Sequence, residues 1–266
     1  MFKKLLLLLM LVSTAAQADY KFIVPQEPGA GTSVWATIIA RHLEPYLGEK
    51  IVIVHIPGAR DIPGFNKFHN ELRKDPKTIM IAHGGNAESF LGERVDYNYH
   101  AYEPIGGMNL SIVTAHRKEL DPYAPSAKIK FAAGSGNNPD IMAMTLLVCG
   151  ELPTLEAYKK CYNEHMTFVK GMKAGERRLA FMRGELNATR ETTAAFIKHV
   201  DPLIDRSEAK LWFSHGVLDL NTGKIVRDPN YPQAGSLEQV YRKRWGKAPR
   251  GPLYEGYVLV KQYRDV

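Results

Sequence analysis

The stretch Phe22–Ser33, FIVPQEPGAGTS, decides how the rest of the chain is organised. It begins as a short apolar strand and continues into a loop with Gly29 and Gly31. A helix follows, for which Thr32 or Ser33 is the expected N-cap. The first amides of a helix have no partner within the helix, and its dipole adds about half a positive charge there. The stretch therefore predicts a site for a carboxylate or phosphate. Apolar residues at helical spacing support the helix: Trp35, Ile38, Ile39 and Leu43.

The loop excludes two familiar phosphate-binding motifs. A Walker A loop ends in Gly-Lys-Ser/Thr, but here Gly31 runs straight into Thr32 without a lysine. A dinucleotide fingerprint needs a third glycine, where this chain has Val34. A plain structural turn remains the alternative, because many such loops use glycine only for its left-handed backbone.

The N-terminus has the pattern of a secretory signal peptide. Lys3 and Lys4 precede the apolar run Leu5–Val12, and Ala16–Ala18 forms a small-x-small cleavage site. We expect cleavage after Ala18. No later segment approaches the ~20 apolar residues of a membrane-spanning helix, so we expect a soluble product outside the cytoplasm.

The charge balance favours small anions over nucleic acid as partners. The sequence has 35 Lys and Arg against 28 Asp and Glu, a formal net charge of +7. The basic residues are scattered, and the clusters at 128–130 and 242–244 are too short for a nucleic-acid-binding stripe.

Cys149 and Cys161 are the only two cysteines. In an oxidising compartment they predict a disulfide. Two cysteines without a paired Cys/His set do not complete a tetrahedral metal site, so no metal is expected.

Two further strand–loop–helix units follow the first. Apolar Ile51–Ile56 leads into the loop Pro57–Asp61, and Thr78–Ala82 leads into the loop His83–Asn86. Such continuous apolar strands indicate a parallel sheet. The three loops then share the sheet edge at which α/β proteins bind ligands.

A second α/β unit follows a crossing that begins near Tyr97. Its loop Gly134–Asn138 is again built of small residues. Two such units predict two lobes with a cleft between them. The other expected elements are strands at 128–133, 168–169 and 211–213 and helices at 141–148, 174–182 and 191–199.

Short motifs in a fixed order give the chain a family resemblance. They are Val24-Pro25, Pro28–Thr32, Ala40-Arg41, Leu43, Leu47-Gly48, Pro57–Ala59, Tyr102, Pro104–Gly106, Gly134–Gly136, Val169–Gly171, Gly184–Leu186 and Pro232–Glu238. Together they resemble the Bug-type periplasmic solute receptors of tripartite tricarboxylate transporters, from about Lys21 to Val260.

The resemblance implies an α/β protein of two-lobed flytrap architecture that closes on a small carboxylate and presents it to a membrane permease. It implies a periplasmic monomer without cofactor or enzymatic activity. The expected division is a signal peptide at 1–18, a first lobe at 19–107 and 215–266, and a second lobe at 108–214. The implied ligand-binding residues of the first lobe are Pro28, Gly29, Ala30, Gly31, Thr32, Ser33, Pro57, Gly58, Ala59 and Arg60. Those of the second lobe are Gly134, Ser135, Gly136, Asn137, Asn138 and Asn187.

Several positions depart from the family pattern. Ser33 and Asn187 stand where the family usually has aspartate, His55 replaces an asparagine, and Arg60-Asp61 replace glycines. These changes make the expected cleft less negative and favour a di- or tricarboxylate. Arg60 either binds a ligand carboxylate through two parallel hydrogen bonds, as a bidentate clamp, or is a surface arginine. Family members also carry further helices beyond the point where this sequence stops.

Two alternative functions remain open. His83–Gly85 is similar to an esterase oxyanion loop, and Ser135 followed by an aspartate and His215 has the chain order of an α/β-hydrolase triad. The acid would be Asp201 or Asp205. The required GxSxG turn is missing, because Ala133 and Asn137 occupy its glycine positions. The second alternative keeps the fold and makes the protein a carboxylate-sensing subunit of a signalling system.

Overall fold

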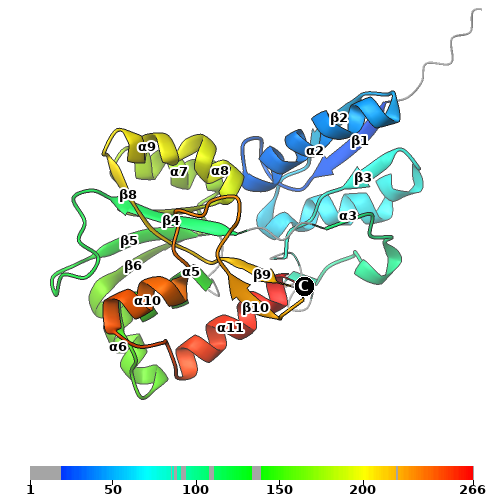
Figure 1. Cartoon of the computed structure of the whole chain (residues 1–266). Helices are drawn as coiled ribbons and strands as arrows, with labels where there is room; N and C mark the ends of the chain where they lie inside the picture. Colours follow the sequence, from blue (N-terminus) through cyan, green and yellow to red (C-terminus); the bar gives the residue numbers. More distant parts are fainter. Residues whose placement is uncertain are drawn as a thin grey trace, which may run out of the picture.

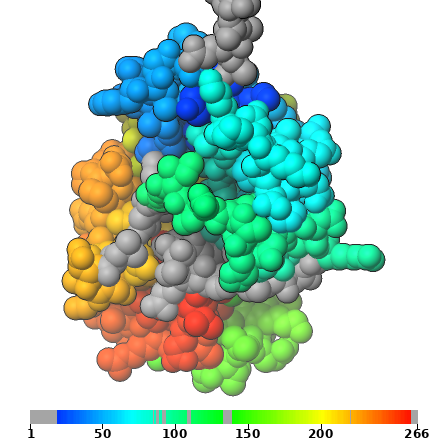
Figure 2. Space-filling model, turned by 90° about the vertical axis from the view of Figure 1, so that its right-hand side faces the viewer, coloured from blue at the N-terminus to red at the C-terminus, as the bar shows by residue number. Residues whose placement is uncertain are grey.

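Two α/β lobes lie side by side in the computed structural model (Figure 1). The first lobe is taken here as residues 20–102, and the second lobe as the elements after it. From the side, the N-terminal strands and helices occupy one end of the molecule and the C-terminal helix lies toward the other (Figure 2). The structure describes residues 19–84, 86, 89–90, 94–107, 111–133, 139–219 and 221–265.

The first lobe has a three-stranded parallel sheet in the order β2-β1-β3, as three successive strand–helix units predict. Phe22 of the central strand pairs with Ile53 on one side and Ile79 on the other. Its elements are β1 (Tyr20–Val24), α2 (Gly31–Leu47), β2 (Ile51–His55), α3 (Ile62–Asn70) and β3 (Thr78–Met80), with short 3₁₀ turns η1 (Ala59–Asp61), η2 (Leu72–Lys74) and η3 (Tyr99–Ala101).

The second lobe contains an antiparallel sheet in the order β7-β4-β8 and a parallel pair β5-β6. Hydrogen bonds between Asn187, just before β7, and Lys130 of β5 join the two sets of strands. The strands are β4 (Ile112–Arg117), β5 (Ile129–Ala133), β6 (Met166–Lys170), β7 (Ala188–Thr192) and β8 (Ala209–Ser214).

Helices cover both faces of these strands (Figure 1). The helix expected at 191–199 begins two residues later, because Glu191 and Thr192 pair with β4. None of the described helices is long and apolar enough to cross a bilayer. The helices are α5 (Pro139–Cys149), α6 (Leu155–His165), α7 (Ala174–Met182), α8 (Thr193–His199) and α9 (Asp201–Asp205).

The C-terminal elements pack on the second lobe. They are the hairpin β9 (Val217–Asp219) and β10 (Lys224–Val226), then α10 (Leu237–Trp245) and α11 (Pro252–Asp265). Leu237, Tyr241 and Tyr257 are fully buried in one cluster with residues of α5. The C-terminal helices therefore share the core of the second lobe, although residues 215–266 were expected in the first lobe.

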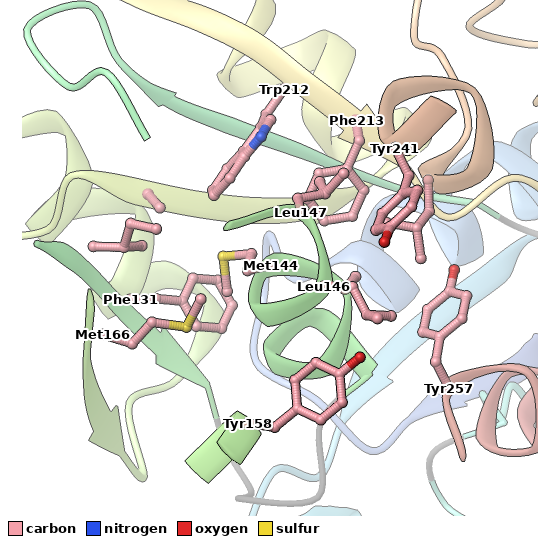
Figure 3. Packing of buried hydrophobic residues seen from close by; sticks show 14 residues of the cluster. Phe131, Met144, Leu146, Leu147, Tyr158, Met166, Trp212, Phe213, Tyr241 and Tyr257 are labelled. Atoms are coloured by element: carbon pink, nitrogen blue, oxygen red, sulfur yellow. The ribbon is translucent and has the colours of Figure 1, made fainter. Parts of the chain in front are cut away.

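Among the described residues, the largest hydrophobic core lies around α5 (Figure 3). Met144, Leu146 and Leu147 of this helix are almost completely inaccessible to solvent. They pack with aromatic side chains from β5, β8, α6, α10 and α11: Phe131, Trp212, Phe213, Tyr158, Tyr241 and Tyr257. Because these side chains come from several elements, they hold α5 in place within the second lobe.

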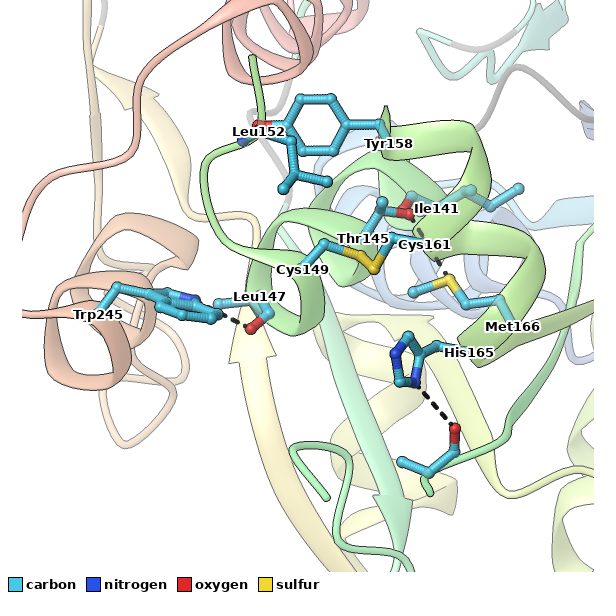
Figure 4. The surroundings of a disulfide bond; sticks show 11 residues. Ile141, Thr145, Leu147, Cys149, Leu152, Tyr158, Cys161, His165, Met166 and Trp245 are labelled. Carbon is cyan, nitrogen blue, oxygen red and sulfur yellow. Dashed lines mark hydrogen bonds between the residues drawn. A yellow bond between two sulfur atoms is a disulfide. The ribbon is translucent and has the colours of Figure 1, made fainter. Parts of the chain in front are cut away.

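The predicted disulfide between Cys149 and Cys161 is present (Figure 4). It joins the last residue of α5 to α6, with the two Cα atoms 6.2 Å apart. The indole Nε1 of Trp245 donates to the carbonyl oxygen of Leu147 at 3.1 Å and fastens α10 to the same end of α5.

Candidate functional site

Helix α2 begins two or three residues earlier than the expected N-caps predict. Ala30 is the N-cap, with extended backbone (φ −64°, ψ 161°) and no side-chain cap. The prediction that Thr32 or Ser33 is the N-cap is therefore wrong. Val34 already donates its amide to the carbonyl oxygen of Ala30, so the helical hydrogen bonds start there. Thr32 and Ser33 are buried in the first turn instead.

The amides of this loop fall into two groups. The protein itself satisfies Gly29 and Ala30, which donate to Ser33 Oγ at 3.2 Å and to the carbonyl oxygen of Glu27 at 3.1 Å. The amides of residues 31–33 donate to no residue that the structure describes. Three first-turn donors therefore remain for an anion.

Ser33 and His55 form a neutral pair beside these donors. Ser33 Oγ lies 2.8 Å from His55 Nε2. The same oxygen accepts from the Gly29 amide, and the tautomer of His55 decides which of the two side chains donates in their shared hydrogen bond. Burial lowers the pKa of His55 and keeps the ring uncharged. The first turn of α2 contains no acidic residue, so no side chain there competes with an incoming anion.

Asp61 is a structural centre of the first lobe that sequence reasoning missed. Its Oδ2 lies 2.9 Å from His83 Nε2 and accepts from Asn86 at 2.8 Å and Gln26 at 3.3 Å. Gln26 follows β1, Asp61 follows β2, and the other two follow β3. One carboxylate thus ties the three predicted loops together.

The second predicted loop, Pro57–Arg60, lies on the rim of the first lobe. Arg60 is exposed and has φ 51°, and Asp61 has φ 65°, a region that residues other than glycine rarely adopt. The role of Arg60 as a carboxylate clamp stays a prediction.

The first-lobe loop meets the second lobe directly. A Cβ atom on Gly31 would lie 2.4 Å from Thr192 Oγ1 at the end of β7, so only glycine fits there. Arg178 of α7 donates to the carbonyl oxygen of Gly29 at 3.1 Å. The predicted anion loop therefore lies at the junction between the lobes.

Buried charges support the second-lobe side of this junction. Glu191 is 2% exposed and lies 3.2 Å from Arg178 and 3.7 Å from Arg177. Burial lowers the pKa of Arg177 to about 10, while the nearby Glu191 opposes that shift. Arg177 also donates to the carbonyl oxygen of Arg190 at 3.1 Å. These contacts fix α7 against β7.

A second buried charge group sits at the start of α5. Asp140 lies 2.8 Å from His215 Nε2 and 3.2 Å from Arg190 Nε, and His215 Nδ1 lies 3.0 Å from the hydroxyl of Tyr257. Burial lowers the pKa of His215, although Asp140 acts in the opposite direction. Because Asp140 also faces Arg190, its charge is partly compensated, and we assign the neutral form to His215.

These contacts overturn the hydrolase triad. His215 is bonded to Asp140 and Tyr257 instead of Asp201 or Asp205. Asp201 accepts a hydrogen bond from the hydroxyl of Tyr231. Ser135 falls outside the described residues.

Asn187 does not face the first-lobe loops. Its side chain accepts from the amide of Lys130 at 2.6 Å and donates to the carbonyl oxygen of Lys128 at 2.7 Å. It precedes β7, while the contact with the first lobe is at Thr192, about 16 Å further along the strand. The asparagine joins β5 to β7. The remaining second-lobe positions, Gly134–Asn138, lie outside the described residues.

Comparison with solved structures identifies the fold. No protein-family model matches the sequence, and the search of characterised proteins gives no match. The structure is similar to the periplasmic binding protein BugD, with 17% identity, a TM-score of 0.59, and coverage of 93% of this chain and 82% of that one. It is also similar to MatC from Rhodopseudomonas palustris with bound malate, with 16% identity, a TM-score of 0.58, and coverage of 94% of this chain and 87% of that one. A third similar structure is an R. palustris protein with adipate, with 15% identity, a TM-score of 0.54, and coverage of 93% and 82%. The chain therefore has the two-lobed α/β fold of these periplasmic binding proteins.

Proposed function

We propose that this chain is a periplasmic solute-binding protein that captures a di- or tricarboxylate and delivers it to a tripartite tricarboxylate-type membrane transporter. One observation carries the proposal. The amides of residues 31–33 open α2, have no partner among the described residues, and lie where the two lobes meet. A carboxylate would accept from them and interact favourably with the helix dipole.

The surroundings of this helix start favour an anion over a cation or a neutral ligand. Ser33 and His55 are neutral, and Arg178 brings a positive charge to the same loop. Closure of the lobes would remove water from the site and strengthen each hydrogen bond to a charged ligand. Among proteins of similar fold, MatC is described with malate and a second protein with adipate, which supports a carboxylate here.

Further contacts belong to the same proposal. Pro57–Arg60 would reach the ligand from the rim of the first lobe, and Gly134–Asn138 would reach it from the second lobe. The secretory signal peptide at 1–18 would direct the protein to the periplasm. The ligand would be transferred by a monomer without a cofactor.

Thr32→Pro tests the proposal by removing one backbone donor. Proline is tolerated in the first turn of a helix, and the preceding Gly31 has no Cβ to clash with its ring. Leu155→Pro is the control for loss of a first-turn amide away from the junction, because Leu155 is the exposed first residue of α6 after the extended Thr154. Both variants lose one first-turn amide, but only one of these amides lies at the junction.

Calorimetric titration with a panel of di- and tricarboxylates provides the measurement. Loss of one hydrogen bond to a charged ligand costs about 1.5–3 kcal/mol, so we expect Thr32→Pro to bind roughly 10- to 100-fold more weakly. Leu155→Pro is expected to bind like the wild type. The proposal is wrong if no carboxylate binds the wild type, or if both variants bind as tightly as it does.

A further inference from the structure

We propose that Arg178 is a positioning residue that reaches across the junction and holds the anion loop in its binding conformation. This inference rests on the proposed function for its effect on affinity. Its effect on the loop itself is measured without a ligand. Arg178 lies on α7 of the second lobe, while the loop Pro28–Ser33 belongs to the first.

The guanidinium of Arg178 joins groups from both lobes. Its Nε donates to Glu191 Oε1 at 3.3 Å, and its terminal NH2 nitrogen lies 3.2 Å from the same oxygen. That nitrogen also donates to the carbonyl oxygen of Gly29 at 3.1 Å. The planar fork of arginine allows one side chain to make these contacts together.

Gly29 connects this arginine to the candidate site. Its φ of +81° lies in the left-handed region, which glycine adopts without steric cost. Its carbonyl oxygen accepts from Arg178, while its amide donates to Ser33 Oγ, which in turn bonds His55. A continuous series of hydrogen bonds therefore runs from Glu191 to the end of β2. Fixing both polar groups of Gly29 fixes the chain immediately before the free amides of α2.

Burial distinguishes this contact from an ordinary surface ion pair. The side chains of Arg178 and Glu191 are only 11% and 2% exposed. A second pair also crosses the junction, with Lys173 Nζ 2.7 Å from Glu27 Oε1, but its side chains are 54% and 36% exposed. Exposed pairs of this kind contribute little, so Lys173→Gln is a suitable control.

Two substitutions separate the hydrogen-bonded bridge that Arg178 forms between Glu191 and Gly29 from the positive charge of Arg178. Arg178→Gln removes both, whereas Arg178→Lys keeps the charge and loses the planar fork. Both should fold, because Glu191 keeps its interaction with Arg177 at 3.7 Å. Thermal melting of each variant establishes this before the other measurements.

The first measurement is amide hydrogen exchange in the absence of ligand. Without the bridge, we expect the Gly29 amide to exchange at least about tenfold faster in both Arg178 variants, because the loop opens more often. The amide of Phe22 in β1 should be unchanged in every variant, and Lys173→Gln should match the wild type at Gly29. A general loss of stability would speed exchange at both positions and would overturn the proposal.

The second measurement is carboxylate affinity, using the panel applied above. We expect both Arg178 variants to bind about tenfold more weakly than the wild type and Lys173→Gln to bind within twofold of it. Full affinity in Arg178→Lys would show that charge suffices and would overturn the bridge. If the wild type binds no carboxylate, the proposed function fails, and the Gly29 exchange rate alone decides the role of Arg178.

Discussion

The two sides of the junction present polar groups in different ways. The first lobe offers backbone amides at the start of α2, next to the neutral pair Ser33 and His55. The second lobe contributes charged side chains that are buried and paired with one another, around Glu191 and Asp140. This contrast suggests that the first lobe supplies the donors for a guest, while the ion pairs of the second lobe hold its elements against that surface.

The largest effect on stability should come from the second lobe. Asp140→Ala would leave Arg190 without its carboxylate and His215 without its partner. Breaking a buried ion pair by removing one member costs about 3–5 kcal/mol, and we expect a loss of that size in the free energy of unfolding. Urea denaturation measures it. Asp205→Ala, at an exposed position of α9, serves as the control and should change stability by less than about 0.5 kcal/mol. Equal effects of the two substitutions would refute the structural role of Asp140.

Reduction of the disulfide should be the next largest effect. The Cys149–Cys161 bond closes a loop of 12 residues between α5 and α6. A loop of about this size predicts roughly 3 kcal/mol of stabilisation. The double variant Cys149→Ser, Cys161→Ser should show this loss in urea denaturation, and a reducing agent should have no further effect on it. Carboxylate affinity should change little, because the bond is remote from α2, and a large loss of affinity would contradict this separation.

A smaller effect is expected in the first lobe. Asp61→Asn keeps the shape of the side chain but removes the charge that accepts from Asn86 and Gln26 and faces His83. We expect a loss of about 1.5–3 kcal/mol in unfolding free energy, the size of a hydrogen bond to a charged group. Carboxylate affinity should also fall, because the three loops are less firmly connected. Glu71→Gln, at an exposed position after α3, is the control. An unchanged affinity in Asp61→Asn would show that the connection does not support the site.

The smallest effect concerns pH. Burial lowers the folded-state pKa of His215 below its unfolded value of about 6.5. As pH falls below about 6.5, the unfolded state takes up this proton first, so the free energy of unfolding decreases. The contribution of the neutral His215 to the free energy of unfolding is fully present above that pH. His215→Gln should lower the slope of stability against pH between 6.5 and 5 by up to about 1.4 kcal/mol per pH unit. His116 and His55 are shifted in the same direction and maintain a residual slope. A slope unchanged by the substitution would mean that His215 does not contribute.

Features set by local sequence could be predicted, and those set by contacts between distant segments could not. The parallel first sheet, the glycine loops and the disulfide follow from apolar runs, glycine spacing and cysteine count. The role of Asp61 could not be predicted, because its hydrogen-bond partners follow two other strands. Asn187 was assigned to the ligand, but its side chain completes the hydrogen bonding between β5 and β7. The position of 215–266 depends on aromatic contacts with α5, which no local pattern reveals.

The start of α2 also differs from the sequence-based prediction, because it depends on a contact with the second lobe. Glycine at 31 suggested a loop residue, yet it is the first residue of the helix, and the nearby Thr192 explains why a side chain is excluded there. Ser33 looked like a cap and instead satisfies Gly29. The amides without a partner among the described residues are therefore those of 31–33, and the two preceding amides are already occupied.

Amide NMR shifts during a carboxylate titration test the central claim most directly. If the ligand binds at the start of α2, the amide protons of Thr32 and Ser33 should move downfield and saturate with the same dissociation constant as calorimetry gives. The amide of Leu155 at the start of α6 should stay in place. Saturable binding that leaves the Thr32 and Ser33 amides unchanged would show that the ligand is held elsewhere and would contradict a site at the start of α2.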